Sequence, residues 1–508
     1  MSIIMRCAST CYVIPLALAV AALGQVAPAT VPAAAPAKLK ITVGRETTFL
    51  TDPPLRGDGT VDYVKAYDAA LRKGVTAENN AFARILTVLG PKVASDKTRA
   101  ATLEALGLKD LPLEGDYYQS FGDYLSAKGV AGDAQLPFFG QLDAVKGHAW
   151  AAEEHPELAA WLAQEEKHLD ALVAATARER FYIPAIPAIS TSGSMIDLWL
   201  PALGALRDAG NGLAARVSLR VGAGNLDGAW KDSLAGHRLG WLLTQQGTLI
   251  EILVGYAIDS LMVKGDGAIL ASPKLTAAQA KACLAELQGL TLGGIGPCLD
   301  QSERLSALDA IMGIAGGRMS VDGIAAGTGQ RLTPEQAARI DWDVILRAIN
   351  VQYDGMVAAA NKPTFAERAA AWKEVSDGIG QGRKDAGAGG QPSEKKLAAV
   401  LLAILTPSVD RADILHDRTA MMAELERVAF ALAAFKAEKG DWPETLDALV
   451  PGYLAAVPKD RFTDQPLHYK PTADGFVVYS VGDDMEDNGG SDARDKKGHF
   501  DLVIRVGK

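Results

Sequence analysis

The order in which hydrophobic periodicity changes along the chain is the strongest constraint on its fold. From about residue 57 to 375, apolar residues recur at helical spacing, as in Val61, Val64, Tyr67 and Leu71. After residue 440 the segments LHYKP, GFVVYSVG and FDLVIRVG alternate with period two. We therefore expect a mainly α chain of bundled or solenoid-like helical hairpins, followed by a small α+β domain with a long helix and a three-stranded antiparallel sheet.

Breaks in this pattern predict the division of the chain. At 508 residues it is too long for one hydrophobic core. A segment rich in Pro, Ser and Thr precedes residue 195, and the Gly-rich, charged segment GIGQGRKDAGAGGQPSEKK resembles a linker. The expected units are helical region one at 39–180, helical region two at 195–375, a linker at 376–396 and the α+β domain at 397–508. Region two should contain a hairpin of helices at 198–221 and 229–243.

The N-terminus predicts export. In MSIIMRCASTCYVIPLALAVAALGQ one basic residue precedes an apolar run from Tyr12 to Leu23, and small residues flank a cleavage point after about residue 24. The run is shorter than the ~20 residues that a spanning helix needs, which favours a signal peptide at 1–24 over an uncleaved anchor. A Pro/Ala linker follows at 25–38. We expect a periplasmic or extracellular protein without stable membrane insertion after cleavage.

Charge and cysteine content restrict the partners and the covalent links. The net charge is -10 and Lys and Arg form no long block, so nucleic acid is an unfavourable partner and a protein partner is expected instead. After signal cleavage Cys283 and Cys298 remain. In an exported protein they favour a disulfide closing the loop between them, with two buried free thiols as the alternative.

The C-terminal segment carries a family resemblance. Gly440 and Pro443 follow the long helix, whose apolar stripe includes Met421, Leu425, Val428, Leu432 and Phe435. Next come Leu446, Leu449, Asp460, Phe462, Pro466, Tyr469, Tyr479, Ser480, Gly482 and Asp484. This succession resembles the soluble domain of the type II secretion major pseudopilin over about 70 residues. Arg461 departs from the family pattern, which has Pro there.

The loop after Tyr479 is a candidate calcium site. Residues 483 to 501 include seven carboxylates, mixed with Asn488, Gly489 and Gly490, and a hard cation would relieve their repulsion. The alternative is a solvated acidic loop without metal. Pseudopilins of this family bind calcium in the corresponding loop, and the resemblance points first to Asp484 and Asp501 as ligands and next to Asp487 and Asn488.

Three other patterns are interpreted as structural. Glu165 and His168 form a Glu-x-x-His step like those of di-iron proteins, but no second step accompanies it, so we expect a solvated helix face. His237 lies in a helical pattern with Trp230 and Trp241, and we expect a satisfied histidine on an apolar face. The stretch GTLIEILVGYAI at 247–258 resembles a prepilin signal, but Thr248 follows its Gly and Asp259 interrupts the apolar run. We expect a buried helix there.

No complete catalytic constellation is visible in the sequence. The favoured hypothesis is an exported, non-enzymatic bacterial envelope or secreted protein: a helical interaction platform with a calcium-stabilised, pseudopilin-like C-terminal module. One alternative is a secreted hydrolase with an active site between the helical regions. Another is an accessory protein of a type II secretion-like apparatus. Fibre assembly by the family's usual route is disfavoured because the first half of the long helix is too polar for membrane insertion.

Overall fold

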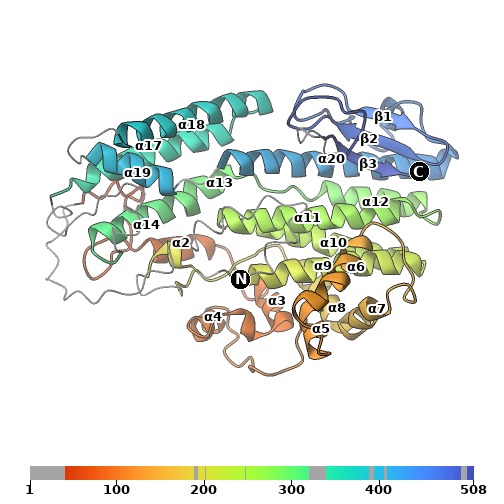
Figure 1. Ribbon diagram of the computed structural model, residues 1–508, viewed down its shortest axis with the longest axis horizontal. Helices are drawn as coiled ribbons and strands as arrows, with labels where there is room; N and C mark the ends of the chain where they lie inside the picture. Colours follow the sequence, from red (N-terminus) through yellow and green to blue (C-terminus); the bar gives the residue numbers. More distant parts are fainter. Residues whose placement is uncertain are drawn as a thin grey trace.

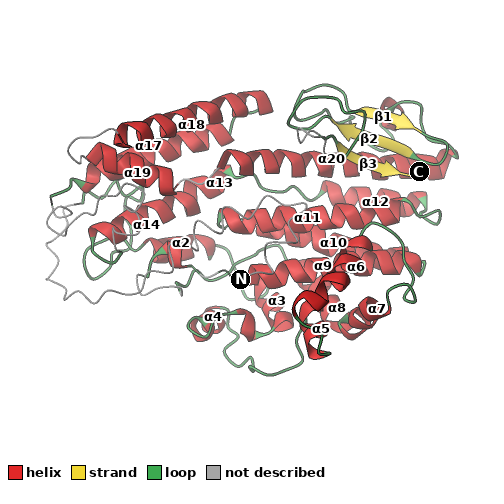
Figure 2. Cartoon of the chain, in the orientation of Figure 1, coloured by secondary structure: helices red, strands yellow, loops and turns green. Residues whose placement is uncertain are grey.

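The computed structural model describes residues 41–187, 193–198, 200, 202–245, 247–319, 339–387, 394–405, 409–493 and 500–507. The protein is mainly helical, and one small antiparallel sheet lies near the C-terminus (Figure 2), which confirms the predicted fold class. The predicted signal peptide at 1–24 and linker at 25–38 lie outside the described residues. Within the part of the chain that the structure describes, no helix is both long enough and apolar enough to cross a lipid bilayer.

Short helices make up the N-terminal part of the chain. They are α2 (Tyr63–Leu71), α3 (Ala81–Leu89), α4 (Arg99–Ala105), α5 (Phe121–Ala127), α6 (Leu136–Ala144), α7 (Pro156–Gln164) and α8 (Glu166–Thr176), with 3-10 turns at Pro91–Val93 and Gly132–Gln135. Asn80 caps α3 by accepting a hydrogen bond from the backbone N–H of Phe82, and Gly90, with φ of 82°, ends it.

Long helices form the middle of the molecule. They are α9 (Ala202–Gly222), α10 (Leu226–Leu243), α11 (Leu249–Leu270), α12 (Ala277–Gln288), α13 (Gly296–Cys298) and α14 (Arg304–Ala315), with a 3-10 turn at Met195–Asp197 and a π turn at Leu299–Glu303. The predicted hairpin is confirmed as α9 and α10, and Asn225 caps the start of α10. The stretch that resembles a prepilin signal is the buried start of α11, where Thr248 and Glu251 form a capping box.

The predicted Gly-rich linker does not separate two bodies. Helices α17 (Trp342–Ala360), α18 (Phe365–Gly387) and α19 (Glu394–Leu405) pack together. Residues 376–387 of the predicted linker continue α18, 394–396 begin α19, and 388–393 lie outside the described residues. The linker prediction is therefore wrong for the part that the structure describes. The segment is helical despite its Gly content because α17 and α19 pack against α18.

The C-terminal unit has the predicted elements. Helix α20 (Val409–Lys439) ends before Gly440, and a 3-10 turn spans Leu446–Leu449. The strands are β1 (His468–Pro471), β2 (Phe476–Ser480) and β3 (Leu502–Val506). They pair antiparallel in the order β1-β2-β3, with Tyr469 opposite Val478 and Val478 opposite Ile504. The sheet covers one side of α20 through β2 and β3.

Helix α20 is buried on two sides, which the single predicted apolar stripe does not account for. Met421, Leu425, Val428 and Leu432 are fully buried as expected, but so are the residues from Ala429 to Ala431. The sheet packs on one side, and α11 and α12 pack on the other (Figure 1). A helix that is apolar around its circumference is typical of an interior position. Helix α20 therefore belongs to both the C-terminal unit and the helical body.

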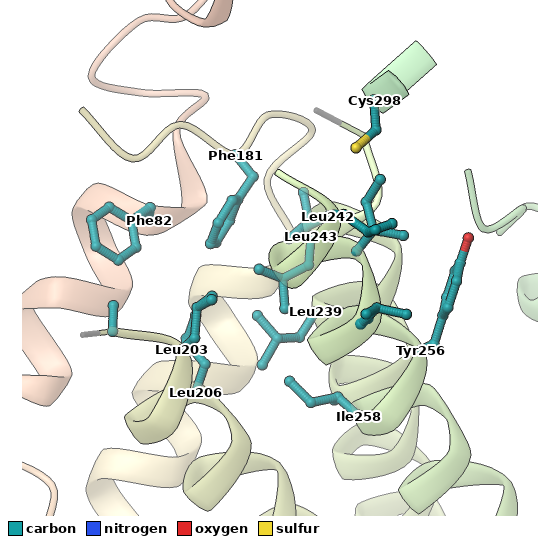
Figure 3. Close-up of a cluster of buried hydrophobic side chains, with 14 of the residues drawn as sticks. Phe82, Phe181, Leu203, Leu206, Leu239, Leu242, Leu243, Tyr256, Ile258 and Cys298 are labelled. Atoms are coloured by element: carbon teal, nitrogen blue, oxygen red, sulfur yellow. The ribbon is translucent and has the colours of Figure 1, made fainter. Parts of the chain in front are cut away.

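The hydrophobic cores cross the predicted domain boundaries. One cluster of buried side chains includes residues from Val61 to Ala412, and joins both predicted helical regions. Figure 3 shows part of it, where Phe82 and Phe181 lie near Leu203, Leu239 and Leu242 from the middle helices. A second cluster includes residues from Val217 to Val506, so the C-terminal unit shares its core with α9 to α12. The predicted boundaries at 180–195 and 376–396 therefore separate no hydrophobic cores.

Glycines let α10 and α11 approach closely. A Cβ atom placed on Gly240 would lie 2.9 Å from the carbonyl oxygen of Gly255, and one on Gly255 would lie 2.7 Å from that of Gly240. The Gly240 Cβ would also lie 3.2 Å from the Cβ of Asp259. The absence of side chains at these two positions thus sets the spacing of α10 and α11 beside a group of buried polar residues.

Candidate functional site

The predicted calcium ligands lie in one loop and mostly bind its backbone. Asp501 is buried, and its carboxylate accepts hydrogen bonds from the backbone N–H groups of Asn488 (3.1 Å), Gly490 (2.7 Å) and Ser491 (3.3 Å). Asp487 accepts from the backbone N–H of Gly489 at 2.8 Å. The loop is therefore closed by carboxylate-to-backbone hydrogen bonds.

The remaining predicted ligands are more exposed. Asp484 accepts a hydrogen bond from the backbone N–H of Glu486 at 2.9 Å, and the side-chain amide of Asn488 donates to the carbonyl of Glu486 at 2.9 Å. Asp487 is exposed and also accepts from the Tyr479 hydroxyl at 3.1 Å. Asp495, another of the seven carboxylates of this segment, lies outside the described residues. Calcium binding by this loop stays a prediction.

The predicted disulfide is wrong: Cys283 and Cys298 are free, buried thiols. Cys283 lies on α12 in the cluster around α20, whereas Cys298 lies in the other cluster, near Leu242 and Leu243 (Figure 3). The segment between them runs from one core to the other, so each sulfur faces a different set of neighbours. Burial raises the pKa of both thiols. The alternative of two free thiols holds.

The Glu-x-x-His step is also not the solvated face that the sequence predicts. Glu165 and His168 are 1% and 8% exposed. His168 Nδ1 lies 2.7 Å from Glu165, whose carboxylate also accepts from the backbone N–H of Gln119 at 3.1 Å. Glu165 stands at the junction of α7 and α8, so the pair joins that corner to the segment before α5. Its role is structural.

A group of buried polar side chains lies where α10, α11 and α20 meet. We call it the polar centre; its members are Ser233 and His237 on α10, Asp259 and Asp266 on α11, and Glu426 on α20. The exposure of these residues runs from 0% to 5%. The spacings of four on α10 and seven on α11 place each pair on one helix face. Three helices therefore direct polar groups into one enclosed place.

His237 is at the middle of the polar centre. Its Nδ1 lies 2.7 Å from Asp259 Oδ1. Its Nε2 lies 3.3 Å from Asp266 Oδ2 and 3.6 Å from Glu426 Oε1. The Ser233 hydroxyl donates to Asp266 Oδ1, the carboxylate oxygen on the other side from His237. Glu426 Oε1 accepts no hydrogen bond among the described residues.

The electrostatics of the polar centre are unbalanced. Burial alone would lower the pKa of His237, but the carboxylates of Glu426 and Asp259 outweigh it and raise that pKa well above its usual value. Burial raises the pKa of Glu426; His237 lowers it, and the charges of Asp266 and Asp259 raise it further. Three buried carboxyl groups thus share one imidazole as their ion-pair partner.

Two other buried aspartates, Asp232 and Asp417, are neutralised by arginine. Asp232 pairs with Arg216 at 2.5 Å and with Arg220 at 2.9 Å. On α20, Asp417 pairs with Arg368 of α18 and, at 2.9 Å, with Arg461. Arg461, the residue that departs from the family pattern, thus ties the segment before β1 to α20. The polar centre differs because its described ion-pair partner is a histidine.

A surface pocket of about 340 Å³ lies beside α2 and the segment 184–187. Asp68 accepts from the Tyr182 hydroxyl at 2.8 Å and from the backbone N–H of Ala185 at 2.9 Å. Arg72 donates to the carbonyl of Ala105, and Arg56 pairs with Asp62 at 3.4 Å. These charged side chains hold neighbouring parts of the chain together, and the described lining residues include no Ser, Cys or His.

The sequence does not predict the polar centre because its members are far apart in the chain. Helical periodicity places His237 and Asp259 each on a buried helix, but it does not bring them together with Asp266 and Glu426. A usable signal exists in the pairs Ser233/His237 and Asp259/Asp266, which recur at helical spacing in otherwise apolar segments. Searches of family models, curated proteins and solved structures found no match to this chain.

Proposed function

We propose that this protein is exported and acts without catalysis, as a helical platform that presents a pseudopilin-like C-terminal module to a protein partner. The observation that carries the proposal is the double burial of α20. Its second side packs against α11 and α12 of the same chain. That side is not available for packing with other subunits, so the module serves as a fixed part of the platform and not as a fibre subunit.

The loop at 483–490 is the part of the module that we expect to meet a partner. Met485 at its tip is 55% exposed and has φ of 57°, a left-handed backbone conformation that non-glycine residues seldom adopt. Asp484 and Glu486 flank it, so an apolar contact is surrounded by acidic groups. This chemistry fits a protein surface with an apolar recess and a basic rim. Pseudopilin-like subunits of a secretion apparatus are the class of partner that the resemblance suggests.

The calcium part of the proposal concerns the same loop. Asp487 is exposed and Asp484 is half-buried, and their carboxylates are oxygen ligands of the kind that calcium binds. A bound calcium ion would hold the loop, and Met485 with it, in one conformation. Calcium added to the metal-free protein should raise the melting temperature, and D484N should abolish that rise.

Site-specific photo-crosslinking in the native cell tests the proposal. A photoreactive residue at position 485 should give one protein adduct in the envelope or secreted fraction. The control is position 136, because Leu136 is 39% exposed on α6 of the helical body. Identical adducts at both positions, or no adduct at 485, would refute the loop as the contact. Recovery of the chain in the cytosol with its first 24 residues intact would refute export.

A further inference from the structure

The distances around His237 match the edges of a metal coordination shell. Single ligand atoms of His237, Asp266 and Glu426 all lie within 4.8 Å of one another. A tetrahedral zinc ion with bonds of about 2.1 Å to nitrogen and oxygen has ligand-to-ligand edges of about 3.4 Å. The two edges from His237 Nε2 are 3.3 Å to Asp266 Oδ2 and 3.6 Å to Glu426 Oε1. Both are longer than the usual hydrogen bond of about 2.9 Å.

The groups behind these three residues are those that orient metal ligands. Asp259 holds His237 by its Nδ1 at 2.7 Å, which turns Nε2 toward the two carboxylates. A carboxylate on the far nitrogen of a histidine is the common support for a metal-binding imidazole. Ser233 donates to Asp266 Oδ1, and thereby leaves Oδ2 directed at His237. The side chains of His237 and Asp266 are thus each oriented by a hydrogen bond with a residue of the neighbouring helix.

The polar centre has more buried acidic groups than basic groups to pair with them, so a bound cation would be favourable. Among the described residues, the ion-pair partner of Asp259, Asp266 and Glu426 is His237, whereas Asp232 and Asp417 each have two arginines. Glu426 is 1% exposed and its Oε1 accepts no hydrogen bond among the described residues. A buried carboxylate oxygen that accepts no hydrogen bond is costly, and a divalent ion would satisfy it.

We propose that His237 Nε2, Asp266 Oδ2 and Glu426 Oε1 bind one divalent transition-metal ion of the zinc type. The mixture of one imidazole and two carboxylates suits such an ion and not calcium, which takes oxygen ligands. Glu426 is on α20 of the C-terminal unit, whereas His237 and Asp266 are on the helical body (Figure 1). The ion therefore fastens the C-terminal unit to the body. This site is separate from the acidic loop and does not depend on the proposed partner.

The competing arrangement is a shared proton in place of a metal. A protonated Glu426 would donate a hydrogen bond to Asp266, and His237 would serve as the cation. The substitution E426Q separates the two arrangements. Gln can donate the same hydrogen bond, so a proton-sharing centre keeps its stability in E426Q. A metal centre loses a charged ligand, and its affinity for the ion should fall by about 100-fold or more.

The experiment uses the full mature chain stripped of divalent ions and titrated with Zn²⁺ and, separately, with Co²⁺. The wild type should bind one equivalent, show the visible absorption of cobalt bound to nitrogen and oxygen ligands, and melt at a higher temperature with either ion. D259N should weaken binding by about 10- to 100-fold, because it removes only the support behind His237. If E426Q failed to fold, the metal titrations of D259N and of the wild type would still show whether the polar centre binds a metal ion.

Two matched controls complete the design. H416Q removes a half-buried histidine on α20, whose Nδ1 lies 3.0 Å from the Tyr256 hydroxyl of α11, about 15 Å along the helix from Glu426. It should bind Zn²⁺ like the wild type. D501N tests whether the ion binds the acidic loop instead. The proposal is overturned if the wild type binds no ion, if E426Q binds as tightly as the wild type, or if D501N alone abolishes binding.

Discussion

Glu251 should make the protein less stable as the pH rises, and E251Q should remove that loss. Glu251 is buried at the start of α11, and its carboxylate accepts from the backbone N–H of Thr248 at 2.6 Å and from its hydroxyl at 3.0 Å. Burial raises its pKa from 4.5 to about 7; the hydrogen bonds from Thr248 oppose this, and Glu303 adds to it. Between these two values the folded state binds more protons than the unfolded state, so stability falls with rising pH.

The size of the effect follows from the two pKa values. Each unit of pKa difference is worth about 1.36 kcal/mol, so the charged form costs about 0.8 kcal/mol at pH 5 and about 3.3 kcal/mol at pH 8. The loss between these two pH values is about 2.5 kcal/mol. A chain of this length has an unfolding entropy of about 1 kcal/mol/K. E251Q should therefore gain about 2 to 3 °C in melting temperature over the wild type when the pH is raised from 5 to 8.

Thermal melts of both proteins at four pH values from about 5 to 8 measure this difference. Gln can replace Glu in a capping box, so the start of α11 is kept. The matched control is E367Q, which changes the corresponding carboxylate in the exposed capping box of Thr364 and Glu367 before α18. Its melting-temperature difference should stay constant with pH. A constant difference for E251Q as well would refute the reasoning from burial.

Three further predictions concern packing, charge and thiols. G240A should lower the free energy of unfolding by about 1 to 3 kcal/mol, because its Cβ would lie 2.9 Å from the Gly255 carbonyl oxygen. G378A lies at an exposed α18 position with no described neighbour within 4 Å, and should raise the free energy of unfolding by up to about 1 kcal/mol. Urea denaturation measures both changes, and changes of the same sign would contradict the packing argument. R368M should cost about 3 to 5 kcal/mol because it leaves the buried Asp413 without its arginine and Asp417 with Arg461 alone. K373M, which removes an exposed pair with Asp377, should cost less than about 0.5 kcal/mol in the same assay. A thiol reagent should label neither Cys283 nor Cys298 in the folded mature protein and both after unfolding without reductant; no labelling of the unfolded chain would show that a disulfide had formed.

The sequence by itself determined the local structure of this protein. Helical spacing predicted the hairpin of α9 and α10 and the buried α11, and period-two alternation predicted the three strands. These features depend on neighbours a few residues apart, so a single sequence displays them. The same reasoning separated the prepilin-like stretch at 247–258 from a working signal, because Asp259 interrupts its apolar run.

Only the tertiary structure decided how the parts combine. The predicted linker became helix because α17 and α19 pack against α18, and the C-terminal unit shares its core with the helical body because α20 is buried on both sides. The polar centre joins His237 to Glu426 across almost 190 residues of chain and draws on three helices, of which α10 and α11 approach closely at Gly240 and Gly255. Periodicity reports which face of a helix is buried, but it does not report which other helix that face meets. Sites formed at such meetings, like the polar centre, are therefore visible only in three dimensions.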